Sequence, residues 1–252
     1  MTNIILSGCS GKMGKVIARE IAKRDDCKVV GGIDVLSDGS AELPVADDCR
    51  QVQEKADAII DFSNPAVLAG LLNYAVSKNV PAVICTTGFS KEQIADIEKA
   101  SKKVAIFHSG NMSLGINLLI ELSKKAAEIL GSAFDIEIIE KHHNQKLDAP
   151  SGTALMIADG ISEVMENEPQ YVYDRHSYRK KREKNEIGIH AVRGGTIVGE
   201  HQVIFAGHDE VVTLTHQAQS KEVFAIGSIN AAVYLSDKTP GMYNMSDMLQ
   251  GK

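Results

Sequence analysis

The sequence has no apolar run long enough to cross a membrane. It has few cysteines, and all four are scattered, with neither a CxxC pair nor metal-ligand spacing: Cys9, Cys27, Cys49 and Cys85. We therefore expect reduced thiols in a cytoplasmic protein and no bound metal. Since the chain enters an apolar strand directly after Met1, we expect no signal peptide.

An excess of basic charge is also lacking. Lys and Arg number 27 against 33 Asp and Glu, a net charge of −6, which argues against a nucleic-acid partner. The KKREK run at 180–184 is the local exception, and we interpret it as a solvated loop. With 252 residues, 44% of them hydrophobic and 24% charged, the chain is typical of a globular protein of one large or two small domains.

The first 34 residues follow the order of a dinucleotide-binding unit. A short apolar strand at 3–7 leads into the glycine turn 8–14, then a helix, a second strand at 27–33, and Asp34. Such a turn lets a pyrophosphate approach the backbone at the helix N-terminus, and the acid accepts hydrogen bonds from a ribose diol. The spacing is GxxGxxG, and glycine turns also join strands to helices for steric reasons alone. The surrounding strand–helix–strand order favours the dinucleotide site.

The alternation of strands and helices continues to residue 112. Strands are predicted at 57–62, 81–85 and 103–107, and a helix at 91–100 after a Ser90 cap. In a doubly wound sheet, ligands bind outside the carboxyl ends of the strands. Polar segments follow each of these ends, although Gly, Ser, Thr and Asn are common in any loop.

The second half of the chain has a different character. A long amphipathic helix is predicted at 114–130, and then come a strand at 134–139, a helix to about 167, an exposed loop at 168–185, strands at 186–192, 199–206 and 210–217, and a helix at 220–235. This pattern predicts a mixed or antiparallel sheet with helices on one face. The fold class is therefore α/β, with a Rossmann-type domain and an α+β domain.

Residues 140–154, EKHHNQKLDAPSGTA, concentrate proton donors and anion-binding groups between a strand and a helix. A helix start has N–H groups without intrahelical partners and attracts an anion. Ser151 or Thr153 can cap it, Lys146 adds positive charge, and His142 or His143 can donate a proton near pH 7. Each residue alone fits a solvated basic loop. Their density favours a site for a small carboxylate that must also be protonated.

This stretch closely resembles the signature of the 4-hydroxy-tetrahydrodipicolinate reductase (dihydrodipicolinate reductase) family, E-x-H-H-x-x-K-x-D-x-P-S-G-T-A, and supplies every fixed position. The resemblance implies an NAD(P)H-dependent reduction of a cyclic imine dicarboxylate to tetrahydrodipicolinate and water, in diaminopimelate and lysine biosynthesis. By motif position, His142 matches the family's proton donor and Lys146 its second proton-handling and carboxylate-binding residue. Substrate anchoring falls to His143, Ser151, Gly152 and Thr153.

Three further segments resemble the family's I-D-F-[ST], G-T-T-G and N-[FM]-S-x-G elements, which line the nicotinamide side of the cofactor. The predicted cofactor-binding residues, from these segments and the glycine turn, are Gly8, Cys9, Ser10, Gly11, Lys12, Met13, Asp34, Phe62, Cys85, Thr86, Thr87, Ser109, Gly110, Asn111 and Met112.

Both NADH and NADPH are expected as cofactors. Family members that prefer NADPH often carry Arg directly after the acid, and here Val35 follows Asp34, which removes a partner for a 2′-phosphate. Lys12 in the glycine turn can replace that arginine in part, so NADPH should still bind. We expect NADH to be used at least as well as NADPH. Lys221 stands where many members have Arg, and we assign it no site role.

The resemblance also implies a domain arrangement. Residues 1–112 and 220–252 would form the dinucleotide-binding domain and 113–219 the substrate-binding and oligomerisation domain, with catalysis in the cleft between them. It further implies a homotetramer built through the sheet of 186–217, whose strands alternate apolar and polar residues.

Two other functions remain possible from the residues. A different two-domain nicotinamide reductase, such as a sugar or amino-acid dehydrogenase, explains residues 1–112 equally well and leaves 140–154 unexplained. A non-catalytic NADH-binding redox sensor needs no His-His-x-x-Lys cluster, and we find no DNA- or partner-binding segment for it.

Overall fold

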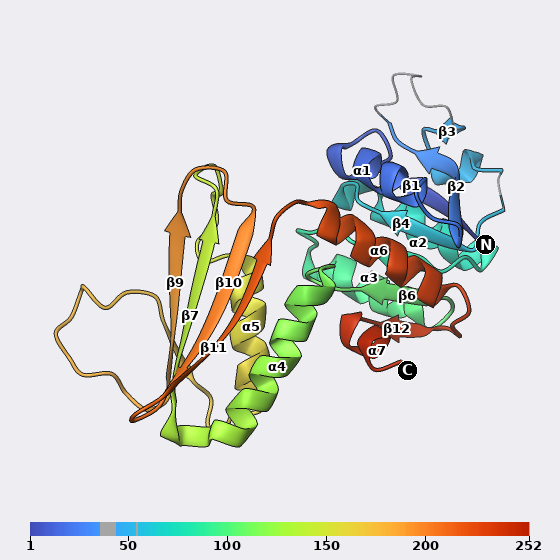
Figure 1. Cartoon of the computed structure of the whole chain (residues 1–252). Coiled ribbons are helices and arrows are strands. Elements are labelled where there is room, and N and C mark those ends of the chain that lie inside the picture. Colours follow the sequence, from blue (N-terminus) through green and yellow to red (C-terminus); the bar gives the residue numbers. More distant parts are fainter. Residues whose placement is uncertain (36–43, 54, 252) are drawn as a thin grey trace. The chain divides into compact units, whose positions relative to one another are not determined.

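The computed structural model describes residues 1–35, 44–53 and 55–251. The chain divides into two compact units (Figure 1). The first comprises Met1–Ser113 and Glu222–Lys252, and the second comprises Leu114–Lys221. No helix within the described ranges is both long and apolar enough to span a bilayer.

The first unit is built on a parallel sheet in the order β12-β6-β5-β4-β1-β2-β3. Its strands are β1 (Thr2–Ser7), β2 (Cys27–Ile33), β3 (Val45–Ala46), β4 (Ala58–Asp61), β5 (Ala82–Ile84), β6 (Ala105–His108) and β12 (Gly241–Tyr243). Apart from the added β12, this is the strand order of dinucleotide-binding folds. The predicted Rossmann-type architecture is therefore confirmed, and the carboxyl ends of β1, β4, β5 and β6 lie along one edge.

Helices complete the first unit: α1 (Lys12–Ile21), α2 (Leu68–Lys78), α3 (Lys91–Ser101), α6 (Glu222–Leu235), α7 (Met245–Leu249), and the short 3₁₀ turns η1 (Cys49–Gln51) and η2 (Pro65–Val67). The central strands are buried apolar runs, as expected for a parallel sheet covered on both faces. The predicted Ser90 cap forms a capping box with Gln93. Gly227 of α6 packs so closely that a Cβ would lie 1.7 Å from the Met112 carbonyl oxygen.

The second unit is a mixed five-stranded sheet in the order β11-β10-β7-β9-β8. Its elements are α4 (Leu114–Leu130), η3 (Gly131–Ala133), β7 (Asp135–His142), α5 (Gly152–Ser162), β8 (Gln170–Val172), β9 (Glu186–Arg193), β10 (Gly199–Ala206) and β11 (Val211–Ala218). The pairs β7–β10 and β10–β11 are antiparallel, and β7–β9 and β8–β9 are parallel. Helices α4 and α5 share one apolar core with one face of this sheet. The prediction of a mixed sheet with helices on one face is confirmed.

Strand β7 is longer than predicted. The apolar run ends at Ile139, but the strand continues through Glu140, Lys141 and His142, whose side chains alternate between buried and half-buried. Polar residues can occupy this strand because β10 pairs with it as far as Lys141 and β9 as far as His142. His142 therefore lies in the last position of the strand and not in the loop.

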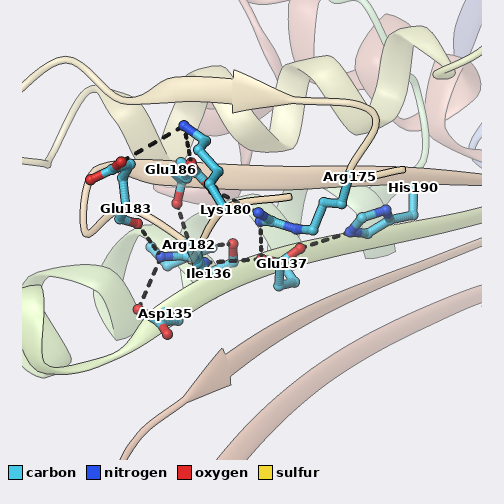
Figure 2. A network of polar contacts seen from close by, with 9 residues as sticks. All are labelled: Asp135, Ile136, Glu137, Arg175, Lys180, Arg182, Glu183, Glu186 and His190. Carbon is cyan, nitrogen blue, oxygen red and sulfur yellow. Dashed lines mark hydrogen bonds and ion pairs between the residues drawn. The ribbon is translucent and has the colours of Figure 1, made fainter. Parts of the chain in front are cut away.

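The prediction of an exposed loop at 168–185 is partly wrong. Besides the short strand β8, this segment carries Arg182, whose guanidinium donates to Glu137 Oε1 at 3.0 Å and to Asp135 Oδ1 at 2.9 Å (Figure 2). Arg175 donates to Glu137 at 2.8 Å and to the buried Glu186 at 2.7 Å. The KKREK run thus contains an arginine that ties the loop to β7, because its carboxylate partners are on strands distant in sequence.

Candidate active site

The end of β7 places two titratable side chains on the face of the sheet that carries the core. Glu140 and His142 are two residues apart in one strand, so their side chains point the same way. Both are buried, with exposed fractions of 0% and 9%. Because a charged group is almost never fully buried unless it is paired, the carboxylate needs nearby partners.

Four donors surround the Glu140 carboxylate. Oε2 lies 2.6 Å from His142 Nδ1 and 2.7 Å from Arg193 Nη1. Oε1 accepts from Arg193 Nη2 at 2.6 Å and from the Ser151 backbone N–H at 2.9 Å. A carboxylate has about four lone-pair sites, so all of them are used. This carboxylate joins the end of β7, the end of β9 and the start of α5.

These contacts determine the charge states. Burial raises the pKa of Glu140, but the hydrogen bonds from Arg193, His142 and Ser151 outweigh it, so the pKa lies below its ordinary value and Glu140 is ionised at neutral pH. Burial lowers the pKa of His142, and the positive charges of Lys146 and Arg193 lower it further. The Glu140 carboxylate acts in the opposite direction and raises it. The net pKa of His142 is lowered, so the resting imidazole is neutral near pH 7.

A second buried histidine lines the site. The ring of His201, on β10, meets the His142 ring edge to face with centroids 5.2 Å apart. Its Nε2 lies 3.1 Å from the Ser151 hydroxyl, which also accepts the Ala154 N–H at 3.2 Å as the cap of α5. Burial lowers the pKa of His201 to about 3, and the imidazolium form of His142 lowers it further. His201 is therefore a neutral side chain that packs against the His142 ring.

The anion-binding groups predicted from the sequence follow in the loop after β7. Lys146 is mostly buried, with 22% of its side chain exposed, and pairs with Asp148 at 2.9 Å. The Lys146 backbone N–H donates to the carbonyl of half-buried His143 at 3.2 Å. Gly152 and half-buried Thr153 form the first turn of α5. The six predicted residues thus lie at the end of β7, in the loop that follows it and at the start of α5.

The other nitrogen of His142 lies close to the backbone of a glycine. Gly199 of β10 faces the ring, and a Cβ there would lie 3.2 Å from Nε2. With Nδ1 occupied by Glu140, Nε2 is the atom at which a proton can be exchanged. Lysine, a helix N-terminus and an exchangeable imidazole suit a carboxylate ligand that receives a proton.

The first unit holds the predicted dinucleotide turn between β1 and α1. Gly8 has a φ of +81°, and a Cβ there would lie 2.4 Å from the Phe62 carbonyl oxygen. A Cβ at Gly14 would lie 2.3 Å from the Gly8 carbonyl oxygen. Gly11 is the N-cap of α1 and supplies no side-chain cap. The turn therefore requires glycine and presents the backbone of a helix N-terminus, which fits a pyrophosphate.

Asp34 lies against this turn. It follows β2, is half-buried, and its Oδ2 accepts the Ser10 backbone N–H at 2.9 Å. Half-buried Cys9 lies beside Gly32, where a Cβ would be 2.5 Å from its Sγ. Lys12 is exposed and Met13 half-buried in the first turn of α1. These predicted residues are therefore gathered around the end of β1.

The ends of β4 and β5 carry a buried carboxyl that the sequence analysis left without a role. Asp61 is 2% exposed and accepts the Ser63 hydroxyl at 2.5 Å and the Thr86 hydroxyl at 2.6 Å. Thr86 also accepts the Ser63 N–H at 2.9 Å. Burial raises the pKa of Asp61, and the hydroxyls of Ser63, Ser7 and Thr86 only partly offset this. Asp61 thus fixes the loops that follow two neighbouring strands.

The remaining predicted residues differ in exposure. Thr87 and Gly110 are exposed, Phe62 and Ser109 are half-buried, and the side chains of Cys85, Asn111 and Met112 are buried. The Ser109 hydroxyl donates to the Asn111 carbonyl at 3.0 Å, and Asn111 Oδ1 accepts the Ser113 N–H at 2.8 Å, which shapes this loop.

Sequence reasoning missed three residues of the second unit's site. Glu140 is part of the signature but received no role, Arg193 was assigned to a turn, and His201 to a strand. The sequence offers a signal for two of them. Arg193 is a polar residue at the end of an apolar strand, and His201 is a polar residue inside one. Across residues 1–35, 44–53 and 55–251, no group of three or more His, Cys, Asp or Glu is placed to hold a metal ion.

Comparison with known proteins identifies close relatives of the chain. Among curated proteins, the 4-hydroxy-tetrahydrodipicolinate reductases of Caldanaerobacter subterraneus subsp. tengcongensis and Clostridium novyi are 51% and 49% identical to it. The first alignment covers 99% of both chains and the second 100% of both.

Two solved structures share the fold of this chain. A dipicolinate-bound dihydrodipicolinate reductase from Paenisporosarcina sp. TG-14 superposes with a TM-score of 0.80 at 26% identity, covering 97% of each chain. A myo-inositol dehydrogenase from Corynebacterium glutamicum, with a TM-score of 0.61 at 16% identity over 99% of this chain and 93% of that one, shares the fold alone.

Family-level sequence models match both parts of the chain. The model of the N-terminus of dihydrodipicolinate reductase matches residues 2–112, and that of its C-terminus matches residues 115–249. The chain therefore belongs to the dihydrodipicolinate reductase family, whose members are NAD(P)H-dependent oxidoreductases with an N-terminal dinucleotide-binding domain.

Proposed function

We propose that the chain acts as a 4-hydroxy-tetrahydrodipicolinate reductase of diaminopimelate and lysine biosynthesis. In this reaction a cyclic imine dicarboxylate gains a hydride and a proton, loses water, and becomes tetrahydrodipicolinate. NAD(P)H supplies the hydride when bound, so the protein's task is binding, orientation and proton handling. The observation that carries the proposal is His142, held by Nδ1 to the buried Glu140 carboxylate, which leaves Nε2 for proton exchange. Lys146 lies in the loop that follows, and the start of α5 is joined to the same carboxylate through the Ser151 N–H.

The residues divide by role in this proposal. His142 donates the proton, and Lys146 assists it and binds a substrate carboxylate. His143, Ser151 and the N–H groups of Gly152 and Thr153 anchor the dicarboxylate, because fixed positive charge and helix-start donors offset the desolvation of two carboxylates. The cofactor is held by the glycine turn, Asp34 and the loops after β4, β5 and β6, through the cofactor-binding residues predicted from the sequence. We place the dinucleotide-binding role in the first unit and the substrate-binding role in the second.

A coupled assay tests the proposal. NADH oxidation is followed with freshly generated product of dihydrodipicolinate synthase as substrate. We expect His142→Ala and Lys146→Ala each to lower turnover by about two to four powers of ten, with NADH affinity nearly unchanged. His208→Ala, whose side chain is 97% exposed in a turn, is the matched control and should keep wild-type turnover. Wild-type protein without turnover, or variants that lose NADH binding, would contradict the assignment.

Cofactor choice is a finer part of the proposal. Asp34 accepts hydrogen bonds from the adenosine ribose, and its charge repels a 2′-phosphate, while Val35 offers no counter-charge. We therefore infer that NADH is used at least as well as NADPH, which still binds. Comparison of kcat/KM for the two cofactors tests this, and a hundredfold advantage for NADPH would contradict it.

We further propose that the chain is a cytoplasmic homotetramer assembled through the sheet of the second unit. The face of this sheet opposite α4 and α5 carries apolar side chains such as Ile139, Ile204, Val192 and Val211, the last two 44% and 62% exposed. An apolar sheet face of this kind is stabilised by a second layer. Light scattering should give the mass of four chains, and Ile204→Asp should dissociate them. A wild-type monomer at working concentration would contradict the proposal.

A further inference from the structure

The Glu140 carboxylate is buried at the centre of the site, yet substrate and cofactor binding as proposed leave it without a task. Its side chain is fully buried, and all four of its lone-pair sites face donors from Arg193, His142 and Ser151. A buried charge is expensive unless it is fully paired, and replacing such a pair with apolar residues is often neutral or stabilising. A role beyond stability would explain why this pair lies beside His142.

The proton positions follow from these contacts. The Arg193 guanidinium and the Ser151 N–H can only donate, and an ionised carboxylate can only accept. The ring atom that faces Glu140 Oε2 at 2.6 Å must therefore carry a hydrogen. The neutral form of His142 is then the Nδ1–H tautomer, and its Nε2 lies beside Gly199 as the site that gains and loses a proton.

We propose that Glu140 and Arg193 are positioning residues for proton transfer: Glu140 fixes the tautomer and ring orientation of His142 and stabilises its imidazolium, and Arg193 keeps Glu140 ionised and in place. The inference rests on the proposed role of His142 as proton donor. Arg193 fits its part because it binds both carboxylate oxygens and is held in turn by the carbonyls of Val192 and Asp148, each at 2.7 Å.

The charges around His142 show why the carboxylate matters. Lys146 from the following loop and Arg193 from the end of β9 are positive and disfavour the imidazolium, and burial acts in the same direction. His201 on β10 is neutral, and His216 on β11 is opposite it in the strand register. Glu140 is the group that favours the imidazolium. Removing its charge should lower the affinity of Nε2 for a proton.

A neutral amide in the same place tests this. In Glu140→Gln the amide oxygen can still accept from Arg193, which leaves the amide N–H₂ facing Nδ1. Nδ1 must then accept, and the neutral ring carries its hydrogen on Nε2. We expect kcat to fall by about 10²- to 10⁴-fold, the alkaline limb of the kcat/KM profile to move to lower pH, and NADH affinity to stay unchanged.

A matched control separates positioning from stability. Glu186 is also fully buried and pairs with an arginine, its Oε2 accepting from Arg175 at 2.7 Å (Figure 2). It opens β9, whereas Arg193 closes that strand seven residues later, about 23 Å away at the rise of a strand. Glu186→Gln should lower the melting temperature as Glu140→Gln does, but should leave the pH profile unchanged.

A spectroscopic measurement needs no turnover. Long-range ¹H–¹⁵N spectra of ¹⁵N-histidine protein distinguish the two tautomers, and the His142 signals are assigned by their loss in His142→Gln. We expect Nδ1–H in neutral wild-type protein and in Glu186→Gln. In Glu140→Gln the hydrogen should be on Nε2.

Each measurement supports or overturns either the positioning role or the proposed function. Nε2–H in the neutral wild-type ring overturns the proposal even if Glu140→Gln does not fold, and so does an unchanged pH profile in a folded Glu140→Gln protein. A wild-type protein with the expected tautomer but no turnover on the synthase product contradicts the proposed function and leaves the positioning of His142 supported.

Discussion

Replacing Val35 with arginine should move the cofactor preference toward NADPH. The Asp34 carboxylate is tied to the glycine turn through the Ser10 N–H at 2.9 Å, so it has a fixed place at the end of β2. A ribose diol donates to such a carboxylate, whereas a 2′-phosphate is repelled by it. The next residue, Val35, is 68% exposed, so an arginine there has room to extend without repacking.

The size of the effect follows from the hydrogen bond that a guanidinium at position 35 would donate to the 2′-phosphate. A hydrogen bond to a charged group contributes about 1.5–3 kcal/mol, which corresponds to roughly a 10- to 150-fold change. Because position 35 is largely exposed, water and salt screen this hydrogen bond. We therefore expect the lower end, about a tenfold rise in the ratio of kcat/KM for NADPH to that for NADH.

The assay compares wild type, Val35→Arg and Val35→Met with both cofactors at low and moderate salt. Methionine adds length without charge and should leave the ratio unchanged. The arginine effect should shrink as salt rises, since the screening length falls to about 8 Å at physiological ionic strength. An unchanged ratio in the arginine variant would refute the placement of the 2′-position beside residue 35.

Three further predictions follow from particular contacts. Gly227→Ala should destabilise the protein by about 1–3 kcal/mol, seen as a lower melting temperature, because its Cβ would overlap the Met112 carbonyl. The free energy of unfolding should fall as pH drops from about 6.5 to about 3, because in this range His201 is protonated in the unfolded chain but stays neutral when buried in the folded protein. The slope should be at most about 1.4 kcal/mol per pH unit. Asp148→Asn should lower the substrate KM a few-fold, because Lys146 loses a competing carboxylate at 2.9 Å.

Each of these has a control and a contrary result. Gly70→Ala, in α2 with no atom within 4 Å of its Cβ, should stabilise by about 0.5–1 kcal/mol; equal melting temperatures for the two glycine variants would contradict the overlap. His201→Gln should flatten the acid slope in urea unfolding and the exposed His208→Gln should not, so equal slopes speak against a neutral His201. An unchanged or higher KM in Asp148→Asn would show that Asp148 does not compete for Lys146.

The parts of the fold that depend on local pattern could be predicted from the sequence. Buried parallel strands read as apolar runs between glycine turns, which predicted the order of β1, α1 and β2, and periodicity predicted the bounds of α4 without error. The end of β7 was missed because polar residues there resemble a loop. Their place in the sheet depends on pairing with β9 and β10, which periodicity in one strand does not reveal.

The predicted catalytic and substrate-binding residues lie in one continuous motif, whereas two of the three missed ones lie far from it in the chain. Arg193 is 53 residues from Glu140 and reaches it because the parallel pairing of β7 and β9 sets His142 opposite Arg193. His201 faces Glu140 through the antiparallel register of β10. A one-residue slip in either register would turn these side chains to the other face, and registers are fixed by packing of the whole core.

The assembled charges explain how a buried histidine can be neutral at rest and still act as an acid. Two carboxylates, Glu140 and Asp148, balance two cations, Arg193 and Lys146, and the lowered pKa of His142 keeps its ring neutral near pH 7. On the proposed function, an arriving dicarboxylate adds two negative charges close to the ring. Opposite charge within a few ångströms favours the charged form of a group, so substrate binding itself favours the imidazolium. Because Glu140 already holds Nδ1, the proton taken up is on Nε2, the nitrogen that lies beside Gly199.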